Sequence, residues 1–345
     1  KDTSGGTYVR DNNGNLTGIL KDNAMYKVET IIPEADDEMK LRCLQAATEY
    51  VHSKGVTSVH HMGTWDDVRI FEMAKDQGLL NVRINAAVPI STYEKLKKRK
   101  TTKGWGDEWV KLGGLKGFID GSLGSHTALM QEAYSDAPDD HGLLVTEAET
   151  MVELVKAGDE FGGQAIVHAI GDKANNIMLN IYDRVIQENG PRDRRFRIEH
   201  AQHLLPEDIA RFGELDIIAS MQPYHCIDDG RWAEPLIGKE RMQTTHAYRS
   251  LLETGATVVF GSDWYVAPPT PLEGIYAAVT RRTLDGKNPE GWVPAQKISV
   301  EEALKAYTVT PAYASFEEAV KGTLEPGKLA DIVIINTCGF ILDAK

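Results

Sequence analysis

The chain has 345 residues, enough for one large α/β domain or two domains of medium size. Its formal net charge is −13, and acidic and basic residues are mixed, so no concentrated basic face is available for nucleic-acid phosphates. No apolar run of about 18 residues predicts a membrane span, and the first residues show no signal-peptide pattern. The three cysteines lie far apart, which is typical of reduced thiols, so we expect a cytoplasmic protein.

The predicted elements begin with a β-hairpin at residues 8–20, where two short apolar runs flank the turn sequence Asn13-Gly14. After Pro33, helical spacing of apolar residues alternates with short β-branched runs. Helices are expected near residues 36–54, 66–77, 147–161, 174–187, 248–253, 272–281 and 300–307, and after Pro206. Strands are expected near residues 56–60, 82–88, 109–119, 164–168, 196–200, 217–221 and 257–261, with a last apolar strand at 331–335.

This alternation indicates a parallel sheet that is covered by helices on its outer side. About seven of the strands fall between residues 57 and 261, and a closed barrel of this class has eight. We therefore predict an α/β fold of the TIM-type (β/α)8 class whose first strand is absent from the chain.

Polar residues follow several of the predicted strands at the point where each strand ends. His168, the pair Glu199-His200 and Asp263 come directly after apolar runs, and Lys116 lies inside one. In a parallel barrel these carboxyl-terminal ends share one face, and enzymes of this fold build their active sites there.

Each of these residues also has an ordinary structural explanation. A single histidine at a strand end is more often hydrogen-bonded than metal-bound, Asp263 could cap the next turn, and Lys116 could point into solvent. Together, however, two histidines and an aspartate on separate strand ends fit a divalent metal site of nitrogen and oxygen ligands.

Six motifs, in this order along the chain, resemble the family-3 amidohydrolases, the YtcJ-like branch of the amidohydrolase superfamily. The resemblance covers essentially the whole chain. Each motif is weak alone, and the number and order of the motifs make the resemblance specific. They are the stretches 5–20, 116–125 (KGFIDGSLGS), 168–172 (HAIGD), 197–203 (RIEHAQH), 260–264 (FGSDW) and 322–331.

The resemblance implies a barrel that holds one or two divalent metal ions, usually zinc. Lys116 would be the lysine that family members carboxylate to bridge two metals, because a carbamate offers the ligand oxygens that an ammonium group lacks. His168 and His200 would bind one ion. Asp263 would bind the other and carry protons, so Lys116 and Asp263 are also the predicted catalytic residues.

Two departures from the family pattern are visible. The family has an HxH pair at the end of the first barrel strand, and no HxH occurs in this sequence. The family usually has Asp where this chain has His61, for which we favour a supporting or structural role over that of a replacement ligand. The expected domains are a hairpin insertion at 1–32, barrel strands 2 to 8 at 33–320 and a partial β-sandwich segment at 321–345.

Further polar and aromatic side chains are candidates for contacts with a small-molecule substrate, with loop packing as the alternative. They are His126, His203, Gln222, His225 and Trp264. The basic run Lys95–Lys103 is expected to be a solvated helix face. Nucleic-acid and membrane partners are not expected, and self-association into a homo-oligomer stays open.

These observations favour a metal-dependent hydrolase that cleaves a C–N bond in an amide or in an N-acyl or N-formyl compound. Ester or phosphoester hydrolysis is a rival, because the same metal centre supports it. A rival of a different class is a non-catalytic or regulatory barrel that binds a small molecule after losing part of its metal site. The missing HxH favours that rival, whereas Lys116, His168, His200 and Asp263 favour the enzyme.

Overall fold

Seven parallel strands form the centre of the protein in a computed structural model that describes residues 3–335. They pair strictly in chain order, so each crossover connects neighbouring strands. The strands are β3 (Ser58–Met62), β4 (Arg83–Pro89), β5 (Val110–Phe118), β6 (Gln164–Ala169), β7 (Arg197–His200), β8 (Ile218–Met221) and β9 (Val258–Phe260). All seven predicted barrel strands are confirmed, each within a few residues of its predicted bounds.

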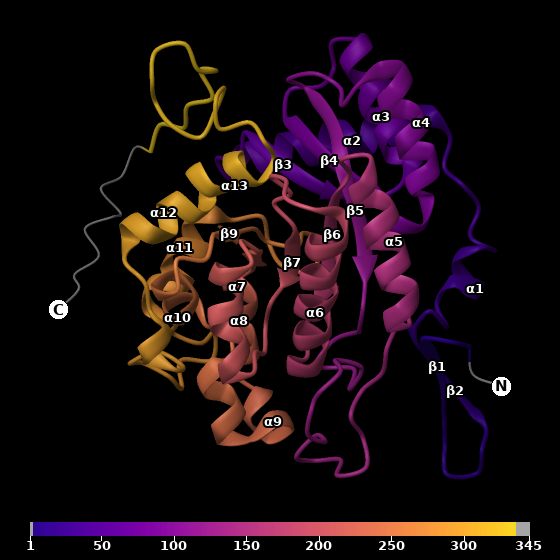
Figure 1. Cartoon of the computed structure of the whole chain (residues 1–345), viewed down its shortest axis with the longest axis vertical. Coiled ribbons are helices and arrows are strands. Elements are labelled where there is room, and N and C mark those ends of the chain that lie inside the picture. Colours follow the sequence, from indigo (N-terminus) through magenta and orange to yellow (C-terminus); the bar gives the residue numbers. More distant parts are fainter. Residues whose placement is uncertain (1–2, 336–345) are drawn as a thin grey trace.

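Helices pack along the outer side of the sheet, as α5 and α6 show most clearly in Figure 1. Their apolar faces explain their positions, since α6 alone buries Ala174, Met178, Leu179 and Val185. The longer helices are α2 (Asp37–Ser53), α3 (Trp65–Asp76), α4 (Tyr93–Lys103), α5 (Ala148–Glu160), α6 (Asp172–Asn189), α11 (Pro271–Thr280) and α12 (Val300–Tyr307). The shorter helices are α1 (Tyr26–Glu29), α7 (Ile209–Glu214), α8 (Pro223–Asp229), α9 (Ala233–Arg241), α10 (Tyr248–Glu253) and α13 (Val309–Ala314).

The sheet curls into an incompletely closed barrel whose edges, among residues 3–335, are β3 and β9. Arg197 of β7 crosses the interior and contacts His60 of the edge strand β3, with 2.8 Å between Nη1 and Nδ1. Nη2 of Arg197 also donates to Ser220 of β8 at 3.0 Å. These contacts join three strands through polar groups inside the curl.

The last described residues run across the amino-terminal ends of the strands. Arg83 of β4 forms a 2.7 Å ion pair with Asp331, and Gln164 of β6 donates to the carbonyl of Ala314 at 2.9 Å. In Figure 1 this yellow segment lies above the sheet, opposite the loops that follow the strands. The carboxyl-terminal ends of the strands, where the candidate site residues lie, are therefore left to those loops.

The predicted strand at residues 331–335 is wrong, because the structure has no strand there. Asp331 is held by Arg83, but the apolar residues after it meet no strand edge within residues 3–335. A β-branched run without a pairing edge has no reason to become a strand. The rest of the predicted β-sandwich segment, residues 336–345, lies outside the described residues.

The predicted hairpin is present as β1 (Gly6–Arg10) and β2 (Leu16–Asp22), and it projects from the body beside α1 (Figure 1). Its connection is longer than the two-residue turn that Asn13-Gly14 favours, because Arg10 pairs with Leu16. The side chain of Asp11 accepts the backbone N–H groups of Asn13 and Asn15, which stabilises this wider loop. None of the helices within residues 3–335 is both long and apolar enough to cross a bilayer.

Candidate metal centre

His168 and His200 stand side by side at the carboxyl ends of β6 and β7. Their ring centroids are 4.5 Å apart with the rings nearly perpendicular, and both side chains are buried. Burial is the main cause that lowers the pKa of His168 to about 3 and the pKa of His200 well below its usual value. Both rings are therefore neutral at physiological pH and can offer a lone pair to a cation.

The hydrogen bonds of His200 identify which of its nitrogens is free. Nδ1 lies 2.8 Å from Oε1 of Gln222, whose Nε2 donates to the carbonyl of Ser220 at 3.2 Å. With its amide oxygen facing the imidazole, Gln222 is the acceptor and Nδ1–H the donor. The lone pair of His200 is therefore on Nε2.

The same reasoning applies to His168 with the opposite result. Its Nε2 lies 2.8 Å from the carbonyl oxygen of Gly121, which can only accept. Nε2 therefore carries the proton, and Nδ1 holds the lone pair. Each histidine thus has one nitrogen fixed by a hydrogen bond and one left for a ligand.

Three side chains converge on a position that could hold an ion. Ligand atoms of His200, His225 and Asp263 all lie within 4.8 Å of one another. Nε2 of His225, in the first turn of α8, is buried and has no hydrogen-bond partner. An unpaired buried nitrogen costs free energy unless something occupies it, so the donor set fits a divalent cation.

Two of these residues adopt backbone conformations that residues other than glycine rarely take. His200 has φ = 75° and Asp263 has φ = 57°, both in the left-handed region. Such conformations are costly and are concentrated at functional sites. Asp263 stays partly exposed, yet burial raises the pKa of its carboxyl group to about 6 while the charge of Lys116 opposes the rise.

Lys116 lies on the interior face of β5, and its Nζ is 4.2 Å from the centre of the Phe118 ring. Burial lowers the pKa of Lys116 to about 8, against the opposing charges of Glu199 and Asp263. Glu199 is itself paired with Arg197 at 2.5 Å. The amine is therefore neutral in a larger fraction of molecules than an exposed lysine would be.

The other predicted site residues differ in whether they contact the candidate ligands. Gln222 supports His200, and His225 lies among the candidate ligands rather than only beside a substrate. His203 is 1% exposed and its Nδ1 lies 2.8 Å from Thr245 Oγ1, away from the converging set. Substrate contacts of His203, His126 and Trp264 stay predictions.

His126 and Trp264 occupy loops at the rim. The ring of His126 stacks on Tyr134 at 4.3 Å, and its nitrogens lie 3.3 Å and 3.6 Å from Asp136 and Asp140. Trp264 is 44% exposed and packs against Tyr50 of α2, with ring centroids 5.5 Å apart.

His61 lies on the outer face of β3 rather than in the barrel. Its Nε2 is 3.5 Å from Asp67, and its ring meets Phe71 of α3 edge-on with centroids 4.9 Å apart. This packing against a helix agrees with the structural role that the sequence favours. The basic run in α4 also behaves as expected, since only Leu96 of that helix is buried.

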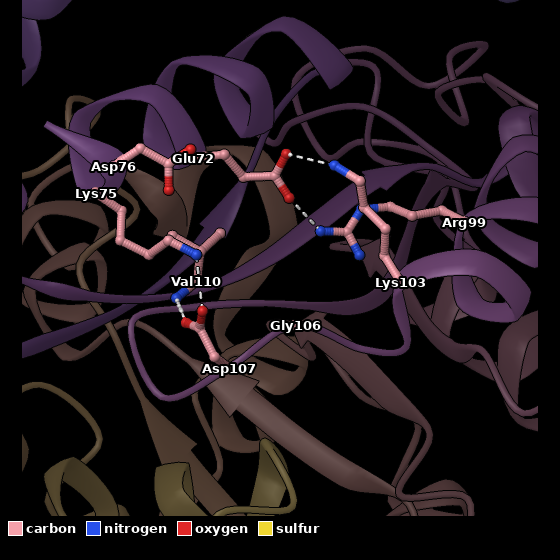
Figure 2. Close-up of a pocket in the computed structure, with 8 residues that line it drawn as sticks. All are labelled: Glu72, Lys75, Asp76, Arg99, Lys103, Gly106, Asp107 and Val110. Atoms are coloured by element: carbon pink, nitrogen blue, oxygen red, sulfur yellow. Dashed lines mark hydrogen bonds and ion pairs between the residues drawn. The ribbon is translucent and has the colours of Figure 1, made fainter.

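A separate hollow of about 260 Å³ lies on the outside of the barrel, between α3, α4 and the turn before β5 (Figure 2). Its charged groups face one another: Glu72 pairs with Arg99 and Lys103, and Lys75 pairs with Asp107 at 2.7 Å. Because these charges neutralise one another, we assign this hollow no ligand.

Sequence comparison agrees with this geometry, as the amidohydrolase family matches residues 1–345. The chain belongs to the amidohydrolase family. Protein LONG AFTER FAR-RED 3 of Arabidopsis thaliana is 41% identical over 98% of this chain and 60% of its own length. The Bacillus subtilis protein YtcJ, named as an amidohydrolase, is 31% identical over 99% of this chain and 65% of its own. The chain thus spans less than two thirds of the length of these relatives.

Two further proteins bear on the chemistry. An N-substituted formamide deformylase of Arthrobacter pascens is 27% identical over 53% of this chain and 33% of its own. The crystal structure of an uncharacterized metal-dependent hydrolase from Pyrococcus horikoshii superposes with a TM-score of 0.82. It is 28% identical and covers 94% of this chain and 65% of its own.

Proposed function

We propose that this amidohydrolase chain forms the metal-binding core of a hydrolase that cleaves a C–N bond with metal-activated water. The substrate would be an amide or an N-acyl compound, N-formyl compounds included. The observation that carries the proposal is the convergence of His200, His225 and Asp263, with an unpaired buried nitrogen on His225.

One or two divalent ions, zinc before others, would be held by His168 through Nδ1, by His200 through Nε2 and by Asp263. His225 is a further candidate ligand. Bound there, a divalent ion would lower the pKa of a coordinated water and polarise the scissile carbonyl group.

Lys116 would join this set as a carbamate. Its pKa of about 8 leaves a fraction of neutral amine at pH 7, and the nitrogen lone pair can attack carbon dioxide. A new N–C bond forms, one proton leaves the nitrogen for solvent, and two oxygens replace a group that cannot bind a cation. The carbamate of Lys116 would then face His168 and His200.

Asp263 would move the proton. Its pKa is about 6 without a metal and would be lowered by a bound cation, so its carboxylate is ionised at pH 7 and can accept a proton from the attacking water. The protonated form is then acidic enough to donate to the departing nitrogen. One carboxyl group can thus perform both transfers in one cycle.

The choice of a C–N bond is supported by the family and by the similarity to the formamide deformylase. The test is hydrolysis by zinc-loaded protein of a matched panel: N-formyl and N-acetyl amines, the corresponding carboxyl esters, and a phosphate monoester. Amide cleavage that disappears on metal removal and returns with zinc is expected, and Asp263→Asn serves as the inactive control. Turnover of esters or phosphoesters alone would replace the proposal, and zinc binding without any turnover would favour the small-molecule-binding alternative.

A further inference from the structure

Asp120 is a buried carboxylate directly behind His168, and the proposed reaction gives it no role. It follows β5, is 1% exposed, and places Oδ1 3.5 Å from Nε2 of His168. A charge in such a position is expensive to bury without a purpose or a full set of partners.

Both carboxylate oxygens of Asp120 accept hydrogen bonds from backbone N–H groups. Oδ2 accepts the backbone N–H groups of Leu129 and Gly171, each at 2.8 Å, and Oδ1 accepts that of Ile170 at 3.0 Å. The side chain therefore ties the loop after β5 to the loop after β6, the strand that carries His168. The close approach requires glycine at position 171, since a Cβ there would lie 2.0 Å from the carbonyl oxygen of Leu129.

The position of this carboxylate matters for the imidazole in front of it. Nε2–H of His168 donates to the carbonyl of Gly121, the residue next to Asp120, so both acceptors act on the same side of the ring. When Nδ1 binds a cation, the ring gains positive charge. Burial raises the pKa of Asp120 to about 7, and a positive charge on the ring 3.5 Å away favours its ionised form, so the carboxylate stabilises that charge. Partners of this kind orient metal-bound histidines generally.

We propose that Asp120 is a positioning residue that holds His168 as the Nε2–H tautomer and aims its Nδ1 at the metal position. The proposal rests on the metal site of the proposed function. Asp120 touches neither the substrate nor the reacting atoms; it acts through His168.

The chain offers a matched control in Asp172. This carboxylate is also buried and accepts two backbone N–H groups, from Gln131 and Lys173 at 2.7 Å each. It links the loop after β5 to the first turn of α6, directly after the loop that Asp120 holds. No imidazole is hydrogen-bonded or ion-paired to it among residues 3–335. A purely structural role of these carboxylates predicts similar effects of Asp120→Asn and Asp172→Asn, whereas a positioning role separates them.

The experiment measures zinc affinity of the full chain by competition with a chelator of known affinity. Asp120→Asn should weaken zinc binding about 10- to 100-fold, the range typical for partners of ligating histidines, and Asp172→Asn should leave it within about twofold. Equal affinity of Asp120→Asn and wild type, or equal losses in both variants, would overturn the proposal.

A second measurement does not depend on the variants folding. Nitrogen-15 NMR of the metal-free wild type, with His168 assigned by a His168→Gln spectrum, should show protonated Nε2 and unprotonated Nδ1. The opposite tautomer would overturn the role of Asp120. If wild type bound no zinc, the proposed function would fail, and the opposite tautomer would still overturn this inference.

Discussion

Nδ1 of His200 lies 2.8 Å from Oε1 of Gln222, and this contact decides which edge of the imidazole faces the candidate metal position. Gln222→Leu removes the acceptor and should lower zinc affinity about 10-fold or more. Gln222→Glu keeps an acceptor for Nδ1–H and should retain most of the zinc affinity. If Gln222 instead contacts the substrate, the leucine variant will bind zinc normally and show only a raised KM.

His200 and His203 lie three residues apart and should respond differently to alanine. His200→Ala removes a candidate ligand, so elemental analysis should show less bound metal with a small change in melting temperature. His203→Ala removes one buried hydrogen bond of Thr245 Oγ1, which still donates to the carbonyl of Arg241 at 3.1 Å, at a cost of about 0.5–1.5 kcal/mol of folding free energy. Its metal content should equal that of wild type; a loss there would place His203 in the metal site.

Asp263→Asn should abolish turnover and keep the fold, because an amide cannot accept the proton of the attacking water. In the metal-free protein burial raises the pKa of Asp263 to about 6, and a bound cation would lower it, so kcat/KM of the zinc-loaded wild type should rise with pH below 6 and level off by pH 7. Melting temperature provides the control. A variant with near wild-type rate would assign Asp263 to the turn after β9.

Lys116→Met keeps an apolar stem of similar length and removes the amine. Wild-type protein loaded with zinc in ¹³C-bicarbonate should show a carbamate signal by NMR, and the methionine variant should not. Lys111→Met is the control on the same strand, because Nζ of Lys111 donates to the carbonyl of Ser315 on the opposite face of the barrel. An unchanged signal in Lys116→Met would exclude the carbamate at this position.

The edges of β3 and β9 have no second strand partner among residues 3–335, and open edges invite pairing with added strands. A segment that carries an HxH strand, fused or supplied in trans, should therefore raise metal stoichiometry and activity together. Elemental analysis would measure the metal, an amide-hydrolysis assay the activity, and size-exclusion chromatography the association state. An isolated chain that is monomeric, stable and as active as the extended form would contradict this expectation.

Much of the barrel could be predicted because buried parallel strands are short apolar runs that alternate with helical patterns along the chain. Helix α9 was not predicted, because Gly238 interrupts its helical backbone at φ = 74°. The strand predicted at 331–335 is absent, because it has no strand edge to pair with among residues 3–335. The β-propensity of a segment can be read from its residues, whereas a strand also needs a neighbouring strand with which it can form hydrogen bonds.

The same distinction applies to the site. Lys116, His168, His200 and Asp263 could be proposed from their places in or after apolar strands. The position of His225 among the candidate ligands could not, since it depends on how α8 begins after β8. The place of Asp120 behind His168 depends on three backbone groups from two loops, and no spacing in the sequence encodes that arrangement.

The contacts at the amino-terminal ends of the strands have a consequence for how this protein can be altered. Arg83 with Asp331 and Gln164 with Ala314 fasten the barrel on the face that carries no candidate ligand. The parts of the opposite loops that hold neither a candidate ligand nor the contacts of Asp120 can then be exchanged without loosening this fastening. Substrate selectivity can thus be changed in one part of the chain while folding stability is maintained by another. This separation makes the protein a practical scaffold for directed evolution of those loop segments.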